Sequence, residues 1–169
     1  MSTEERADLL QVRHPLAWVY ERSTGPIFGR YLAGLRAGVL FGGRGPWGEV
    51  VVPPPEAFPN GQAVTELVAV GPGGVVTGWT WQAVPRPGLP LNVPFAWALV
   101  LLDGATGPMV HAVAAPSIDA MATGVRVTAR WRDERRGEPG DLVCFDLVRP
   151  DGAGAPGVAQ PGSEGGADG

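Results

Sequence analysis

Arginines stand on one side of the most regular alternating segment of the chain. In VRVTARWR, residues 125–132, Arg126, Arg130 and Arg132 alternate with apolar residues. Because successive strand side chains point to opposite faces, the pattern predicts a strand with these guanidinium groups on one face. A guanidinium fork fits both phosphate and carboxylate groups. The three arginines are therefore candidate contacts for a phosphate-bearing cofactor or a partner's carboxylates, and an ordinary solvated face is the alternative.

Other reactive side chains give no catalytic pattern. His111, in PMVHAVAAP, has no His, Cys or acidic neighbour at metal-ligand spacing, so we interpret it as structural. A role as catalytic base would require a cleft around it. Cys144 is the single cysteine, which excludes an intrachain disulfide, and its apolar neighbours predict a buried, inert thiol. The sequence has no nucleophile elbow, phosphate-binding loop or dinucleotide fingerprint, which predicts a chain that is not an enzyme by itself.

Composition limits the class of protein. Of 169 residues, 26 are Gly and 18 are Pro, which favours short strands and many turns. The segment 150–169 is rich in Gly and Pro, and we predict that it is a disordered tail. Its Asp151, Glu164 and Asp168 supply three of the negative charges, so the net charge of −4 becomes −1 without it. A nearly neutral folded part speaks against general nucleic-acid binding.

Neither a membrane span nor a secretion signal is apparent. No apolar run approaches the length of a membrane-spanning helix, and the charged start MSTEERADLLQVRH lacks a signal-peptide core. The sequence therefore predicts a cytoplasmic protein without a membrane partner.

The order of predicted elements indicates the fold. Residues 1–37 form an N-terminal helical segment, with a short helix over residues 4–11 and a better one over residues 26–37, which starts at Pro26 and ends before Gly38. Residues 38–63 predict a hairpin, and residues 64–149 hold five or six strand-like runs. One short helix, residues 117–124, lies between the third and fourth strands of the last five.

Three strands, a short helix and two strands is the order of an OB-fold, a five-stranded Greek-key barrel. The predicted class is thus mainly β. The strand FAWALVLL, residues 95–102, is apolar on both faces, as expected beneath a covering element. Trp79 and Trp81 share one face of their strand. They are either stacking platforms for nucleic-acid bases or, as we favour, barrel filling, and we expect Trp97 in the core as well.

Two glycine-rich turns in GGRGPWGEVVVPPPEAFPNGQ, residues 42–62, have the outline of a pair of metal knuckles but contain no cysteine. With the elements PIFGRYLAGLRAG, GEVVVPPP, ELVAVGPGGVVTGWTW, PFAWALVLLDG, GVRVTARW and DLVCFDLV, residues 26–148 resemble the DUF35 OB-fold family. Most members of that family carry a zinc ribbon with two Cys-x-x-Cys pairs.

The resemblance implies a rubredoxin-like ribbon that has lost its metal. Arg44 and Trp47 stand at the positions of the first cysteine pair, and Phe58 and Gly61 at those of the second. Zinc is therefore not expected. We expect Trp47, Phe58, the prolines and the preceding helix to supply apolar packing in its place.

The resemblance also implies a function. Members of this family are similar to non-catalytic partners of thiolase-superfamily enzymes, including lipid-transfer-protein-type thiolases or aldolases, or of enoyl-CoA hydratases. The chain would then dock on such an enzyme as part of a hetero-oligomer and help form its acyl-CoA site in steroid or fatty-acid side-chain degradation. It would bind no cofactor alone, although an acyl-CoA is allowed in the complex. The alternative is an OB-fold protein that binds single-stranded nucleic acid.

Overall fold

The computed structural model describes residue 19 and residues 23–148. The helix predicted over residues 4–11 and the tail predicted over residues 150–169 lie outside this part of the chain. No helix among the described residues is long and apolar enough to cross a membrane.

Helix α1 (Pro26–Ala37) begins and ends where the sequence predicts. Pro26 occupies the first turn, where its missing N–H costs no hydrogen bond. Gly38 ends the helix at φ 76°, and the backbone N–H of Gly38 and of Val39 reach the carbonyls of Leu35 and Gly34. The apolar side of the helix buries Tyr31 and Leu35.

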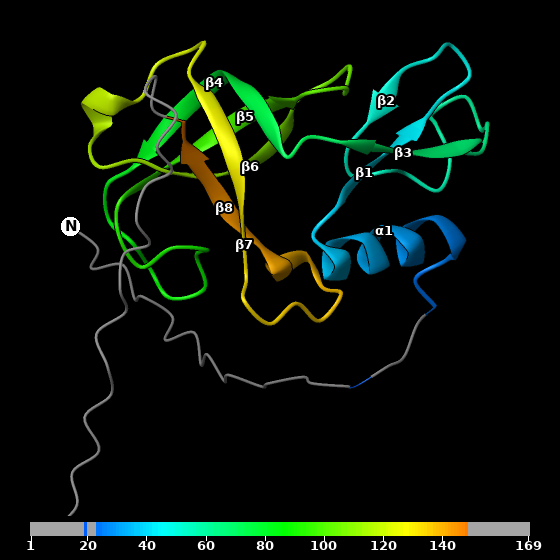
Figure 1. The fold of residues 1–169 in the computed structure, drawn as a ribbon, viewed down its shortest axis with the longest axis horizontal. Helices are drawn as coiled ribbons and strands as arrows, with labels where there is room; N and C mark the ends of the chain where they lie inside the picture. The colour runs from blue at the N-terminus through cyan, green and yellow to red at the C-terminus, as the bar shows by residue number, and fades with distance from the viewer. Residues whose placement is uncertain (1–18, 20–22, 149–169) are drawn as a thin grey trace, which may run out of the picture.

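A small antiparallel sheet follows the helix and lies to one side of the barrel (Figure 1). It contains β1 (Leu40–Arg44), β2 (Val50–Val51) and β3 (Glu66–Val70) in the order β2-β1-β3. The β1–β2 pair is the predicted hairpin. The sequence division assigned residues from 64 onward to the barrel, but β3 pairs with β1 from Leu40↔Val70 to Arg44↔Glu66. A short alternating run does not specify its partner strand, which is why the sequence missed this pairing.

The remaining strands close into a five-stranded barrel, which confirms the predicted OB-fold class. They are β4 (Gly73–Gln82), β5 (Phe95–Leu102), β6 (Met109–Ala114), β7 (Arg126–Trp131) and β8 (Leu142–Leu147). Their order is β4-β5-β6-β8-β7, with β6 and β8 parallel and β4 paired to β7.

Short 3₁₀ helices occupy the two connections around β7. The helix predicted over residues 117–124 is a single 3₁₀ turn, η1 (Ile118–Ala120), in which the Ser117 side chain makes no capping bond. A second turn, η2 (Pro139–Asp141), precedes β8 and was not predicted.

Helix, small sheet and barrel share one hydrophobic core. Leu35 of α1, Leu40 of β1 and Val50 of β2 pack in the same cluster as the barrel interior. The backbone of Val50 also exchanges hydrogen bonds with Thr106 in the β5–β6 turn: its N–H donates to Thr106 Oγ1 at 2.9 Å, and its carbonyl accepts from Thr106 N at 2.9 Å. The small sheet is thus fixed against the turn that joins two barrel strands.

Candidate functional site

The β7 arginines bind carboxylates of their own chain. Arg126 makes a bidentate pair with Asp103 in the turn after β5, with Nη1–Oδ1 and Nη2–Oδ2 distances of 2.8 and 2.6 Å. This hydrogen-bonded guanidinium lowers the pKa of the Asp103 carboxyl. Arg130 reaches across to Asp146 on β8, with Nε 2.8 Å from Oδ2 and a second bond from Nη2 to Oδ1.

Arg132 lies beyond a register shift that separates Arg130 from Trp131. Its Nη1 donates to Glu138 and lies 3.8 Å from a carboxylate oxygen of Asp141. The structure therefore places all three predicted site residues on the outside of the barrel, each beside its own carboxylate. Any phosphate bound there would have to replace or share these partners.

The neighbouring arginines do not simply extend this row. Arg135 Nε donates to the carbonyl of Arg36 at 3.1 Å, at the C-terminal end of α1. A cation is favourable there because the last helical carbonyls carry partial negative charge. Arg135 thus fixes the β7–β8 loop to the helix. Arg136 extends outward, 3.8 Å from Glu134.

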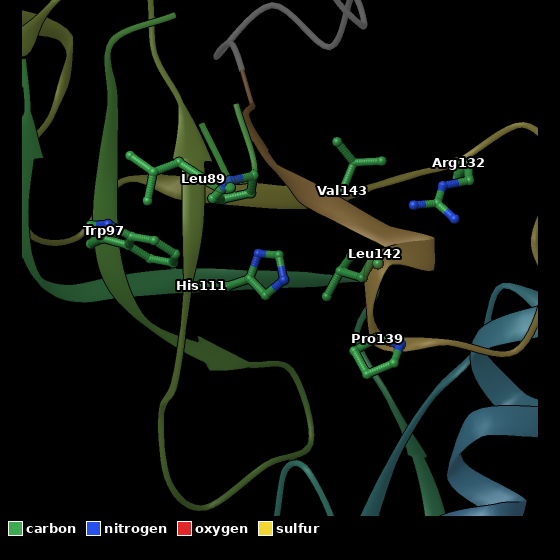
Figure 2. Close-up of a pocket in the computed structure, with 10 residues that line it drawn as sticks. Leu89, Trp97, His111, Arg132, Pro139, Leu142 and Val143 are labelled. Carbon is green, nitrogen blue, oxygen red and sulfur yellow. The ribbon is translucent and has the colours of Figure 1, made fainter. Parts of the chain in front are cut away.

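A cavity of about 440 Å³ lies where β6 and β8 separate. The two strands pair only at Val113↔Phe145 and Ala114↔Asp146, so their other ends leave a gap in the barrel wall. Figure 2 shows His111 between the two strands, with Trp97 and Leu89 on one side and Leu142 on the other. Most of the wall is apolar, and the complete lining is Gly88, Leu89, Pro90, Trp97, His111, Arg132, Pro139, Gly140, Leu142 and Val143.

His111 therefore lies in the kind of cleft that a functional role would require. Burial lowers the pKa of His111, an effect partly offset by the backbone of Ala112, so the imidazole is neutral at pH 7. Its Nδ1 is buried without a hydrogen-bond partner among the described residues, and the ring packs edge-on to Phe145 at 5.6 Å. Apart from Arg132, no other residue that lines the cavity is titratable. The arrangement offers a hydrogen-bonding group in an apolar wall.

The paired tryptophans of β4 serve the core, as favoured from the sequence. Trp79 is in register with Ala98, and Trp81 with Ala96. Both alanines are buried, and both tryptophan rings pack against the main core. The prediction that Trp97 lies in the barrel core is wrong. This residue points to the outer side of β5, is half-buried, and packs with Phe95, Leu89 and Leu91 of a separate small cluster.

An uncharged outer surface spans three strands of the barrel. Cross-strand pairs place Gly78, Leu99 and Val110 in one row. The next row holds Thr80, Trp97 and Ala112, of which Ala112 is fully buried. We call these six residues the uncharged face. The covering element expected over β5 is the β4–β5 loop, whose Leu89 and Leu91 cover only one end, so Leu99 and Val110 stay exposed. Sequence alternation alone did not reveal this face, because β5 is apolar on both sides.

Backbone hydrogen bonds close the two turns at the predicted knuckle positions. Gly48 N donates to Gly45 O at 3.1 Å, and Gly61 N donates to Phe58 O at 2.8 Å, with both donor glycines at positive φ. Arg44, at a knuckle position, bonds Glu66 instead, with Nε 2.8 Å from Oε2. No group of three metal-binding side chains occurs in the described part of the chain, and these residues do not fit a zinc ion.

Packing of the ribbon is only partly as expected. Phe58 is buried, as predicted, and Pro54 and Val64 pack over Gly43, where an added Cβ would lie 3.0 Å from each. The prediction for Trp47 is wrong, because its side chain is 78% exposed. The turn is tight enough to close through backbone bonds and through Glu49, which accepts a hydrogen bond from Trp47 N, so the indole ring extends into solvent.

Cys144 has the predicted environment. It is fully buried beside Phe95 and Ala112, and burial raises the pKa of its thiol to about 11. The nearby Arg130 opposes this rise without reversing it. The thiol is thus protonated and shielded at neutral pH, as expected for an inert cysteine.

Comparison with known proteins agrees with the barrel topology. Residues 67–132 match the model of the ChsH2 C-terminal OB-fold domain family. One similar solved structure, described as an Ltp2–ChsH2(DUF35) aldolase, is 18% identical, with a TM-score of 0.54, and the match covers 78% of this chain and 98% of that one. No curated protein sequence matches the chain significantly.

A second solved structure is a DUF35 family protein of unknown function from Sulfolobus solfataricus. It is 14% identical, with a TM-score of 0.54, and the match covers 73% of this chain and 87% of that one. A ChsH2-type OB-fold model thus matches residues 67–132, and the two solved structures share the fold of this chain.

Proposed function

We propose that the chain is a non-catalytic accessory subunit that docks on a thiolase-superfamily enzyme of the aldolase type. One observation carries this proposal. The part of the chain that matches the ChsH2 OB-fold model also has the fold of a solved structure described as an Ltp2–ChsH2(DUF35) aldolase. An enoyl-CoA hydratase is the second enzyme class that the family resemblance suggests as partner.

The geometry of the chain favours an accessory role over a catalytic one. The cavity at the β6–β8 gap is lined by one neutral imidazole, one guanidinium paired to Glu138 and otherwise apolar or glycine residues. General acid–base catalysis needs proton donors and acceptors that converge on a reacting atom. The arginines of β7 instead pair on the outer surface with carboxylates of the turn after β5 and of β8.

We further propose that Arg126, Arg130 and Arg132 contact the phosphates of coenzyme A when the enzyme complex holds an acyl-CoA. The three arginine side chains are between 39% and 49% exposed, so a phosphate can approach them from solvent. Such a contact requires exchange of the present carboxylate partners, which is feasible for exposed ion pairs because each is weak. Degradation of a steroid or fatty-acid side chain is the pathway that this role would serve.

Co-expression tests the proposal. The chain is produced with each thiolase-like and hydratase-like protein encoded beside its gene, and the products are separated by size-exclusion chromatography with mass measurement. The expected result is a stable hetero-oligomer with a thiolase-like protein. If the purified components remain separate at micromolar concentration, the accessory-subunit proposal is wrong. A labelled single-stranded oligonucleotide, added at low and high salt, tests the nucleic-acid alternative in the same experiment.

A further inference from the structure

The outer surface of the barrel is divided by charge. The β7–β8 side carries the ion pairs of Arg126 and Arg130, whereas the uncharged face on β4, β5 and β6 has no ionisable side chain. In antiparallel strands with one face in solvent, apolar residues that face the core usually alternate with polar residues that face the solvent. The uncharged face therefore departs from the pattern that solvent alone would favour.

Two exposed apolar side chains lie at the end of this face that the β4–β5 loop does not cover. Leu99 is 41% exposed and Val110 is 63% exposed, and the two are direct cross-strand neighbours. Trp97 continues the surface toward the cavity at the β6–β8 gap. Apolar side chains that lie together on a surface mark sites of contact with other proteins.

The cavity provides a second feature of a docking surface. Its volume of about 440 Å³ is ample for one large side chain of a partner, and its walls include Trp97, Leu142 and Pro139. Interface energy concentrates where a side chain fills a dry pocket at the centre of a contact. His111 adds one hydrogen-bonding edge to this otherwise apolar wall.

The type of contact follows from the charge and from the topology. Strands β4, β5 and β6 are paired to one another along the uncharged face, so a partner that covers this face binds it through side chains and not by adding a strand. A charged partner surface would lose hydration against the uncharged face without gaining an ion pair. The matching surface is therefore apolar and uncharged.

We infer that the uncharged face and the adjoining cavity form the surface that docks on the thiolase-like enzyme, through an apolar patch of that enzyme and one large side chain seated beside Trp97. This inference rests on the proposed function, and it adds the location and chemistry of the contact. It also separates the protein contact from Arg126 and Arg130 of β7, which remain available to a phosphate, whereas Arg132 lines the cavity.

Charge insertion tests the location. Leu99→Glu and Val110→Glu each place a carboxylate on the face, and Trp97→Ala removes one wall of the cavity. Ile118→Glu is the matched control, because Ile118 is 47% exposed but lies in η1, outside the face. Circular dichroism verifies that each variant is folded. Affinity for the co-expressed thiolase-like enzyme is then measured with purified components, and hydrogen exchange maps protection in the wild-type complex.

The expected result is at least a tenfold increase in Kd for Leu99→Glu and Val110→Glu, with a change below twofold for Ile118→Glu, and protection of β5 and β6 on binding. If the wild-type chain binds but the face variants bind equally well, the docking surface is elsewhere and the accessory function stands. If the wild-type chain does not bind, the proposed function and the docking surface both fall. If Trp97→Ala does not fold, the two exposed-site variants and the exchange data still decide the result.

Discussion

Arg44 forms an ion pair with Glu66 across strands β1 and β3, with a distance of 2.8 Å between Nε and Oε2. By the family resemblance, this arginine stands at the position of a zinc-binding cysteine. In this chain the position forms a cross-strand pair of opposite charges, a contact that stabilises neighbouring strands modestly. We expect apolar packing to supply most of the stability that a structural zinc ion would provide.

The first prediction concerns metal removal. Dialysis against EDTA should leave the Tm of the chain unchanged within about 1 °C, because the residues at the knuckle positions are not a zinc ligand set. Differential scanning calorimetry before and after dialysis gives the comparison, and elemental analysis gives the zinc content. A stoichiometric zinc ion whose removal lowers Tm would contradict the metal-free ribbon.

Phe58 and Trp47 provide a second, paired prediction. Phe58 is 7% exposed, so Phe58→Ala should lower the free energy of unfolding by about 3 kcal/mol through the cavity that it leaves. Trp47 is 78% exposed, so Trp47→Ala should change stability by less than about 0.5 kcal/mol. Urea denaturation measures both. Equal losses would mean that the indole ring packs against the ribbon after all.

A buried carboxylate in the β7–β8 loop gives the third prediction. Asp141 is fully buried and accepts hydrogen bonds from the backbone N–H groups of Arg136, Gly137 and Glu138, at 2.6 to 3.2 Å. Burial alone would raise the pKa of Asp141, but these three donors, with Arg132 nearby, hold that pKa below its usual value. Asp141→Asn should lower Tm at pH 7 by about 5 °C or more.

The pH dependence of this effect has a defined sign. A carboxyl whose folded-state pKa is lowered stabilises the fold above its unfolded pKa, near 4, and this contribution disappears as pH falls through the folded value. The Tm difference between wild type and Asp141→Asn should therefore be constant from pH 5 to 7 and shrink below about pH 4. Calorimetry across this range measures it, with Asp119→Asn, at an exposed site in η1, as control. A difference independent of pH would show that the carboxylate charge is not the cause.

The sequence predicts those parts of the β7–β8 loop and of the ribbon that depend on residues close together in the chain. The boundaries of α1 follow from Pro26 and Gly38, whose effects on the backbone are intrinsic, and the positions of the barrel strands along the chain follow from alternation and turns. The pairing of β3 with β1 and the carboxylate partners of the arginines join segments far apart in the chain. No local pattern carries that information.

The cavity illustrates the same limit. His111 and Leu142 are separated by about thirty residues in the sequence, and they meet only because the parallel β6–β8 pair is two residue pairs long. Hydrophobic alternation identifies both strands but not how far they stay together. The sequence also does not predict that Trp47 is exposed. An aromatic residue in a turn is typical of a packed side chain, but here backbone bonds and Glu49 close the turn without the indole ring.

Cys144 gives a fourth prediction. Its thiol is fully buried and its pKa is raised to about 11, so reaction with DTNB at pH 8 should be at least about 100-fold slower in the native protein than in 6 M guanidinium chloride. A group with a raised folded-state pKa stabilises the fold below its unfolded pKa, near 9, and loses that contribution as pH rises toward 11. Rapid reaction of one thiol per native chain would contradict the buried site.

The fifth prediction separates the contacts proposed for the enzyme from those proposed for coenzyme A. Docking through the uncharged face is apolar, so the Kd of the protein complex should change by less than about threefold between 50 and 500 mM NaCl. Binding of coenzyme A to the complex should weaken over the same range, because phosphates meet guanidinium groups. Isothermal titration at both salt concentrations measures each reaction.

Neutral substitutions complete this test. A variant with Arg126 and Arg130 both changed to Gln should bind coenzyme A at least about tenfold more weakly in the complex, while its affinity for the enzyme stays within twofold of wild type. Arg132 is left unchanged because it also lines the docking cavity. Arg44→Gln, which removes another ion-paired arginine far from β7 in the fold, is the control and should alter neither reaction. Loss of enzyme binding in the double variant, with coenzyme A affinity intact, would assign Arg126 and Arg130 to the protein interface, because a charge removed from a phosphate contact cannot weaken docking through a face that carries no charge.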